Sequence, residues 1–184
     1  MNSGEQIHKD GKPASGFLAS LPGLIPLTVV MFAWLILDIC SKQWAQKALG
    51  EGGSRELISG WLSLAYVRNY AGAWGFLSFM EETWRSILLT SMSVVSILIV
   101  CVLIFSSAQE EVKARFGLAS LLGGALGNLH DRIRWGYVVD FIDWQKGVDW
   151  PVFNVADIAI TIGIVLLAWD ILGEKRNRKA NEEA

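Results

Sequence analysis

Carboxylates are concentrated in one stretch of an otherwise apolar chain. An apolar run leads into residues 123–157 and another leads out, and the stretch holds five aspartates: Asp131, Asp140, Asp143, Asp149 and Asp157. Ionisable groups beside apolar, membrane-length segments are costly, so they are functional candidates. Two carboxylates held together in a low dielectric do not both ionise readily, and one keeps a proton. Such a pair can activate water and protonate a scissile carbonyl, which is aspartic protease chemistry.

Asp140 and Asp157 are the strongest candidates for such a pair. Two valines precede Asp140 and a phenylalanine follows it, so its local setting is apolar. Asp157 follows Asn154 by three residues, which is the spacing of a helix cap and its N3 acid. Each also has a simpler interpretation. Asp157 can be an acid favoured by a helix dipole, and Asp140 can be a loop carboxylate paired with Arg132 or Arg134.

The other polar residues have weaker signals. Asp143 and Asp149 fall in a polar loop where surface charges are ordinary. Asp38 and Lys42 are four residues apart, a spacing that favours an ion pair on one helix face. Asn128, Asp131 and Arg132 end an apolar run, where an arginine can grip a carboxylate or a lipid phosphate, or simply reach the membrane interface.

Several function classes lack support in the sequence. The net charge is −2 and there is no basic stripe, so a nucleic acid partner is not expected. His8 and His130 stand apart from any serine nucleophile motif. There is no CxxC and no His/Cys cluster with zinc spacing. A metal site made from the carboxylates is possible, but no ligand spacing indicates one.

The composition is that of a membrane protein. Hydrophobic residues make up 52% and charged residues 18%, below the roughly 25% of soluble domains. Because about 20 apolar residues cross a bilayer, the sequence predicts an all-α polytopic protein with four transmembrane helices. The predicted spans are about 17–40, 86–108, 114–130 and 154–172. A pair of small residues, Gly123 and Gly127, would let another helix approach the third span closely.

The charged residues predict an orientation. Tails 1–16 and 173–184 and the loop 106–115 carry eight of the sixteen Lys and Arg in 38 residues, and the opposite segments 41–85 and 130–154 carry eight in 70 residues. The positive-inside rule therefore predicts that both termini are cytoplasmic. Loops 41–85 and 131–153 then lie outside, together with seven of the nine tryptophans. Residues 60–70 and 134–144 alternate partially and predict a small β-rich cradle on the membrane surface.

Four motifs, in order, resemble lipoprotein signal peptidase, the bacterial signal peptidase II family. They are DICSK at 38–42, VRNYAGAWGF at 67–76, GGALGNLHDRIRWGYVVDF at 123–141 and FNVAD at 153–157, within a resemblance that covers about residues 24–172. The second motif departs from the family's usual NxGAAF: its glycine comes one place later and Trp74 replaces a phenylalanine.

The resemblance implies a specific reaction and site. The family's catalytic pair corresponds to Asp140 and Asp157. The supporting or substrate-binding positions correspond to Asn69, Asn128, Arg132, Asn154, Asp38, Lys42 and Asp131. The implied enzyme is a monomeric endopeptidase of the bacterial inner membrane with its site near the periplasmic face. It uses activated water to cut diacylglyceryl-modified prolipoproteins just before the lipidated cysteine, among membrane lipids and without a cofactor or metal.

Two other functions remain open at this stage. A small transporter would use membrane aspartates as a proton relay, and it would need carboxylates at successive depths. A non-catalytic membrane scaffold would tolerate asparagine at both Asp140 and Asp157.

Overall fold

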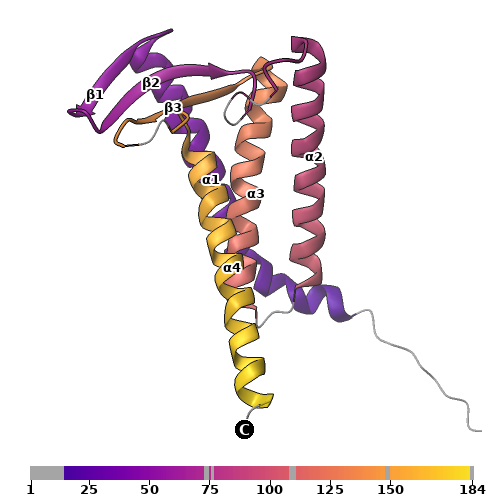
Figure 1. Cartoon of the computed structure of the whole chain (residues 1–184). Coiled ribbons are helices and arrows are strands. Elements are labelled where there is room, and N and C mark those ends of the chain that lie inside the picture. The colour runs from indigo at the N-terminus through magenta and orange to yellow at the C-terminus, as the bar shows by residue number, and fades with distance from the viewer. Residues whose placement is uncertain (1–14, 73–74, 76, 108–110, 148–149, 183–184) are drawn as a thin grey trace, which may run out of the picture.

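The fold is a group of four long helices with a small sheet at one end (Figure 1). The computed structural model describes residues 15–72, 75, 77–107, 111–147 and 150–182, so most of the predicted tail 1–16 and Asp149 lie outside the described residues. The elements are α1 (Ser15–Leu49), β1 (Ser54–Ile58), β2 (Leu62–Asn69), α2 (Glu82–Ser106), α3 (Val112–Trp135), β3 (Val138–Trp144) and α4 (Val155–Glu182).

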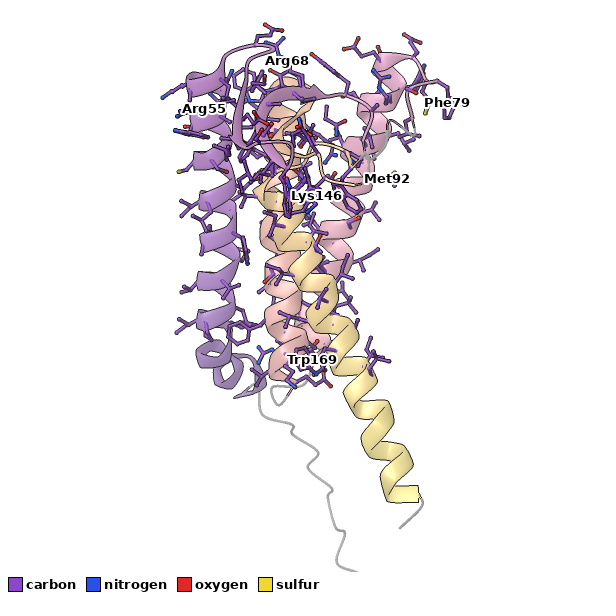
Figure 2. The ribbon with its side chains drawn as sticks, turned by 60° about the vertical axis from the view of Figure 1, so that its left-hand side comes forward. Arg55, Arg68, Phe79, Met92, Lys146 and Trp169 are labelled. Carbon is purple, nitrogen blue, oxygen red and sulfur yellow. The ribbon has the colours of Figure 1, made fainter. Side chains whose placement is uncertain are left out.

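Three described helical segments are long and apolar enough to cross a membrane: Gly23–Leu49, Glu82–Ser106 and Val155–Gly173. Large apolar side chains such as Met92 and Trp169 are exposed on α2 and α4 (Figure 2), as on a surface that faces lipid. The prediction of a mostly helical membrane protein with a small β-rich part is confirmed.

The prediction of four spans is confirmed for three of them only. The predicted third span, 114–130, is a helix, α3, but it is not among the three apolar segments. This helix packs against α1, α2 and α4 and buries twelve of its residues, including Asn128 and Asp131 (Figure 1). Because neighbouring helices cover α3, its sequence can hold polar groups that a lipid-facing helix cannot. A hydropathy criterion therefore misses it, and the structure alone shows three span candidates.

Glycines let α3 approach α1 closely, as the GxxxG pair predicts. A Cβ at Gly123 would lie 2.6 Å from the backbone oxygen of Met31 on α1. A Cβ at Gly127 would press against the carboxylate of Asp38, also on α1. The close approach at Gly127 thus makes room for a buried carboxylate as well as for a helix backbone.

Gly127→Ala should destabilise the fold, because its methyl group and the Asp38 carboxylate cannot both fit. Overpacking of this kind costs about 1–3 kcal/mol, and thermal unfolding in detergent measures it. Gly173→Ala on α4 is the control, since no atom lies within 4 Å of its Cβ position. The control should gain stability through helix propensity, by up to about 1 kcal/mol. Equal melting temperatures for Gly127→Ala and the unchanged protein would contradict the packing argument.

The sheet has the order β1–β2–β3 with antiparallel neighbours. Both β-rich segments predicted from the sequence contain strands, β2 and β3. Their register pairs Asn69 with Val138 and Val67 with Asp140. Tyr66, Tyr137 and Val139 form a small buried cluster of this region. The register therefore fixes which side chain of β2 lies near Asp140.

A left-handed turn joins α3 to β3. Gly136 caps α3 with φ of 77°, and its backbone N–H donates to the carbonyl of Arg132 at 3.0 Å. Glycine adopts this conformation without the steric cost that a Cβ would add. Because the turn is so short, β3 begins at Val138, and Asp140 follows Asp131 by only nine residues across the helix end.

Candidate active site

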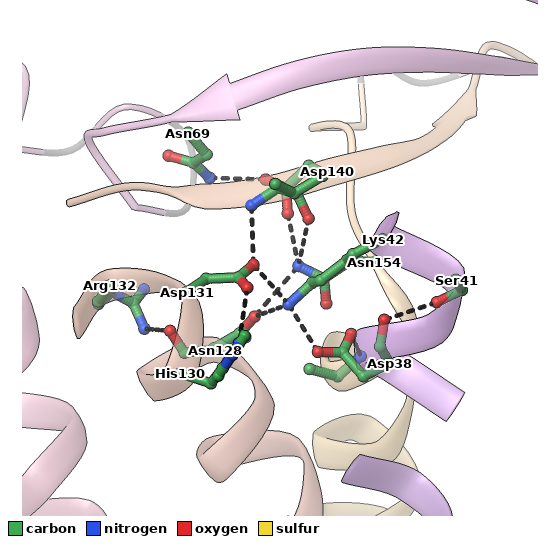
Figure 3. Close-up of polar contacts among 12 residues, drawn as sticks. Asp38, Ser41, Lys42, Asn69, Asn128, His130, Asp131, Arg132, Asp140 and Asn154 are labelled. Carbon is green, nitrogen blue, oxygen red and sulfur yellow. Dashed lines mark hydrogen bonds and ion pairs between the residues drawn. The ribbon is translucent and has the colours of Figure 1, made fainter. Parts of the chain in front are cut away.

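Five elements supply a buried polar network just below the sheet (Figure 3). Six of its side chains are buried: Asp38, Lys42, Asn128, Asp131, Asp140 and Asn154. Buried polar groups are costly unless they are hydrogen-bonded. The network meets that requirement through contacts between segments that are distant in the sequence.

Asn154 and Asp157 begin α4 as a reciprocal cap. The backbone N–H of Asp157 donates to Oδ1 of Asn154 at 3.0 Å, and the backbone N–H of Asn154 donates to Oδ2 of Asp157 at 3.2 Å. The predicted cap is confirmed. Asp157 is more than a helix-dipole acid, however, because its Oδ1 accepts a hydrogen bond from Nδ2 of Asn128 at 2.9 Å.

Two asparagines hold the Asp140 carboxylate. Nδ2 of Asn69 donates to Oδ2 at 2.8 Å, and Nδ2 of Asn154 donates to Oδ1 at 2.6 Å (Figure 3). Oδ1 of Asn69 accepts the backbone N–H groups of Ala71 and Gly72, so its amide has a fixed orientation. No ion pair joins Asp140 to an arginine among the described residues.

Asn154 contacts both candidate carboxylates. Its Nδ2 donates to Oδ1 of Asp140, and its backbone N–H donates to Oδ2 of Asp157. Nδ2 of Asn154 also donates to Oδ1 of Asn128, and Nδ2 of Asn128 donates to Oδ1 of Asp157. The asparagine amides therefore position Asp140 and Asp157 relative to each other.

Burial raises the pKa of Asp140 to about 7, and the negative charge of Asp157 is the next largest cause. Hydrogen bonds from Asn69 and Asn154 and the charge of Lys42 oppose the shift. Because burial and the neighbouring charge of Asp157 both disfavour the ionised form, Asp140 can retain a proton near neutral pH. This is the protonated group that an acid–base pair needs.

Lys42 forms an ionic framework behind this pair. Its Nζ contacts Oδ2 of Asp38 at 2.7 Å, Oδ2 of Asp131 at 3.0 Å and Oδ1 of Asn128 at 3.0 Å. Asp38 accepts the backbone N–H of Ala156, and Asp131 accepts that of Val139. The predicted Asp38–Lys42 pair is confirmed, and it also fastens α1 to the first turn of α4.

Arg132 points towards α2. Its Nη1 donates to Oγ of Ser93 at 3.1 Å and to the carbonyl of Asn128 at 3.5 Å, and it forms no ion pair with a described carboxylate. The contact with Ser93 was not foreseen, since a single serine in a long apolar run is a weak signal. The prediction that Asp143 lies in a polar loop is wrong, because Asp143 is on β3 and lines the same cavity as Asp140. Its Oδ2 accepts a hydrogen bond from Nε2 of Gln145 at 2.7 Å.

The two candidate carboxylates open into different cavities. Asp140 lines a cavity of about 670 Å³ between the end of β2, β3 and residues 150–152. Asp157 lines a more apolar groove of about 460 Å³ with Phe153, Ile158 and Ile162. Trp144 and Trp150 line both. A substrate that reaches both carboxylates can thus place a polar segment and an apolar segment in adjoining spaces.

The sequence model of the family described as signal peptidase (SPase) II matches residues 30–173. The chain belongs to the signal peptidase II family. It is 40% identical over 170 residues to a lipoprotein signal peptidase of Burkholderia ambifaria, covering 91% of this chain and 96% of that protein. A lipoprotein signal peptidase of Burkholderia vietnamiensis is 39% identical with the same coverage.

Two solved structures of bacterial membrane enzymes, determined by the in meso method, have a similar fold. One, at 2.3 Å resolution, has a TM-score of 0.75 and 29% identity over 83% of this chain and 90% of its own. The other, at 1.9 Å, has a TM-score of 0.69 and 30% identity over 80% of this chain and 92% of its own. As a member of the signal peptidase II family, the chain is a membrane protease.

The structure brings together most of the residues that the motifs indicate. Asp38, Lys42, Asn69, Asn128, Asp131, Asp140, Asn154 and Asp157 form one connected network, and Arg132 joins it through the carbonyl of Asn128. In the altered second motif, Gly72 has φ of 77° and its N–H contacts Asn69. Ala73 and Trp74 of that motif lie outside the described residues. Trp144 and Trp150, predicted only as interface residues, are also cavity residues.

Proposed function

We propose that the chain removes the signal peptide from diacylglyceryl-modified prolipoproteins, with Asp140 and Asp157 as its catalytic pair. The observation that carries the proposal is the contact of the Asn154 side chain with both residues, in a site where the pKa of Asp140 is raised to about 7. The lipoprotein signal peptidases of Burkholderia supply the substrate class.

The reaction follows from the two protonation states. The ionised aspartate takes a proton from a water as its oxygen attacks the scissile carbonyl carbon. The protonated aspartate gives its proton to the carbonyl oxygen, which forms a neutral tetrahedral intermediate. On collapse, the carbon–nitrogen bond breaks and the departing amine takes a proton from the pair, while one hydroxyl of the intermediate returns its proton to the pair and becomes the carbonyl of the new acid. We assign one proton to the pair as a unit, because coupled carboxylates titrate together.

The cavities fit a substrate that is part peptide and part lipid. The Asp157 groove is lined mainly by apolar residues, including Phe153, Ile158 and Ile162. We propose that it receives acyl chains or the apolar signal segment, while the Asp140 cavity receives the peptide bond. We also propose four membrane crossings, cytoplasmic termini and a sheet on the periplasmic surface of the bacterial inner membrane. The Lys and Arg distribution supports that orientation.

A cleavage assay tests the substrate assignment. The purified chain in detergent is mixed with a prolipoprotein carrying diacylglyceryl on its cysteine and, separately, with the same protein lacking the lipid. Cleavage before the cysteine should occur only with the lipidated protein, and mass spectrometry locates the cut. Cleavage of both forms at the same rate would exclude lipid recognition. A proton relay is the less favoured function, because Asp38, Asp131, Asp140 and Asp157 gather at one end of the helices.

Activity should fall on the alkaline side of about pH 7. Burial raises the pKa of Asp140 from its ordinary value of 3.8 to about 7, so the pair keeps its one proton below this pH and loses it above. Because the doubly ionised pair has no proton for the carbonyl, kcat/KM should drop about tenfold per pH unit in the alkaline limb. A pH–rate profile with the lipidated substrate measures it.

The variant Asn69→Ala tests whether the loss of the Asp140 proton causes the alkaline decrease in kcat/KM. Its hydrogen bond lowers the pKa of Asp140, so the alkaline limb should move to higher pH when the amide is removed. A profile that is flat from pH 6 to 9 would contradict the shared-proton mechanism.

A further inference from the structure

A separate polar cavity lies between the sheet-proximal ends of α1 and α3. Its volume is about 270 Å³, and its lining includes Gln43, Gln46, Lys47, His130, Arg134 and Trp135. None of its lining residues also lines the Asp140 cavity or the Asp157 groove. The cavity shares Lys42 and Asp131 with the ionic framework of the candidate active site, but it opens apart from Asp140 and Asp157.

The cavity carries positive charge that the described residues do not neutralise. Lys47 and Arg134 are exposed and have no ion-pair partner in the described part of the chain. Asp131, the carboxylate of the lining, already accepts from Lys42 and from the backbone of Val139, and it contacts His130 at 3.3 Å. The guanidinium of Arg134 lies 4.7 Å from the ring centre of Trp135. Two cations without a carboxylate partner among the described residues, with amide and imidazole groups beside them, are suited to an anion such as phosphate.

The surroundings indicate that the anion is part of a lipid. The cavity is at the end of the helices that bears the sheet, where Trp44 and Trp135 are about half exposed, as tryptophans at headgroup level are. Ile36 lies seven residues before Gln43 on α1, so both occupy one helix face, and its side chain is 56% exposed. An acyl chain can pass Ile36 while the headgroup occupies the cavity.

We propose that this cavity binds the phosphate of an anionic phospholipid headgroup, with Lys47 and Arg134 as its principal ligands. Gln43 and His130 are placed to donate further hydrogen bonds. Two juxtamembrane cations raise the affinity for an anionic lipid about 10- to 30-fold over a zwitterionic lipid. This site goes beyond the proposed cleavage reaction and does not depend on it.

Native mass spectrometry of the full chain in detergent tests the site. Phosphatidylglycerol and phosphatidylcholine with identical acyl chains are titrated separately. The unchanged protein should bind one phosphatidylglycerol about 10- to 30-fold more tightly than phosphatidylcholine, and Lys47→Gln/Arg134→Gln should lose that preference. Both side chains are exposed, so the variant should fold. The control, Arg55→Gln/Lys146→Gln, removes two exposed cations from the sheet region (Figure 2) and should keep the preference.

Each other outcome overturns the proposal. If both double variants lose the preference equally, general charge and not this cavity attracts the lipid. If Lys47→Gln/Arg134→Gln binds phosphatidylglycerol like the unchanged protein, the cavity is not the site. Inorganic phosphate distinguishes a free anion from a lipid. It should displace the lipid only at concentrations far above that of the lipid, and displacement at equal concentration would assign the cavity to free phosphate.

Discussion

Asp140→Asn and Asp157→Asn should each lower kcat for cleavage of a diacylglyceryl-modified prolipoprotein by at least about 10³-fold. Positioned acid–base groups contribute about 10²–10⁴-fold each, and the proposed mechanism uses both carboxylates in the same step. With Asp157 changed, the network lacks the charged partner that helps to raise the pKa of Asp140. With Asp140 changed, the amides of Asn69 and Asn154 no longer hold a carboxylate that can share the proton with Asp157. A gel-shift assay at saturating substrate measures the loss.

Structural damage must be separated from this chemical loss. Both oxygens of Asp140 accept amide N–H bonds, so an asparagine there opposes one donor with its own NH₂ group. The same holds for Asp157, whose two oxygens accept from Asn128 and from the backbone of Asn154. Each variant can therefore lose about 1–3 kcal/mol of stability. Melting temperature and KM should be measured with kcat, since only the chemical role predicts a loss confined to kcat.

Asp170→Asn is the matched control for this experiment. Asp170 lies on α4, thirteen residues after Asp157, and outside the network and its cavities. Its change should leave kcat within about twofold. A folded Asp140→Asn or Asp157→Asn that keeps a tenth of the activity would show that the residue is structural. Asp131 would be the next carboxylate to test.

Contacts within one turn of helix were predictable from the sequence. The Asn154–Asp157 cap and the Asp38–Lys42 pair each join residues three or four apart, where helix geometry alone fixes proximity. Both are present with good hydrogen-bond or ion-pair distances. The β-rich character of the segments that contain β2 and β3 also followed from local alternation.

Contacts between distant segments were beyond the sequence pattern. Asn69 meets Asp140 across 71 residues because of the β2–β3 register and its bulge between Leu64 and Val67. Lys42 meets Asn128 across 86 residues because α1 and α3 pack at their glycines. The motifs of the family indicated these residues, but only the fold shows which atoms they contact.

Two elements differ from local expectation for physical reasons. The β1 strand, Ser54–Ile58, is exposed along its whole length, so it has no buried face and no apolar alternation to detect. The α3 helix is too polar for the membrane-span criterion because it is enclosed by the other helices. Hydropathy measures the preference of a residue for lipid or for water. Because β1 has no buried face and α3 mainly faces other helices, hydropathy predicts neither element.

Lys42→Met should destabilise the protein by about 3–5 kcal/mol, the loss expected when one partner of a buried ion pair is removed. The Lys42 side chain is 3% exposed and lies between the carboxylates of Asp38 and Asp131, which are 0% and 4% exposed. Without the ammonium, two buried carboxylates face each other with no countercharge. Each must then take up a proton or admit water. Thermal and denaturant unfolding in detergent measure the loss.

Lys113→Met is the matched control for that variant. Lys113 is exposed on α3, where its ammonium lies 5.2 Å from the ring centre of Trp169, and its change should cost less than about 1 kcal/mol. The pH dependence distinguishes an ionic role for Lys42 from a packing role. Because low pH protonates the stranded carboxylates, the deficit of Lys42→Met should shrink as the pH falls from 7 to 5. A deficit that stays constant over this range would mean that Lys42 stabilises the bundle mainly by filling space with its methylene chain.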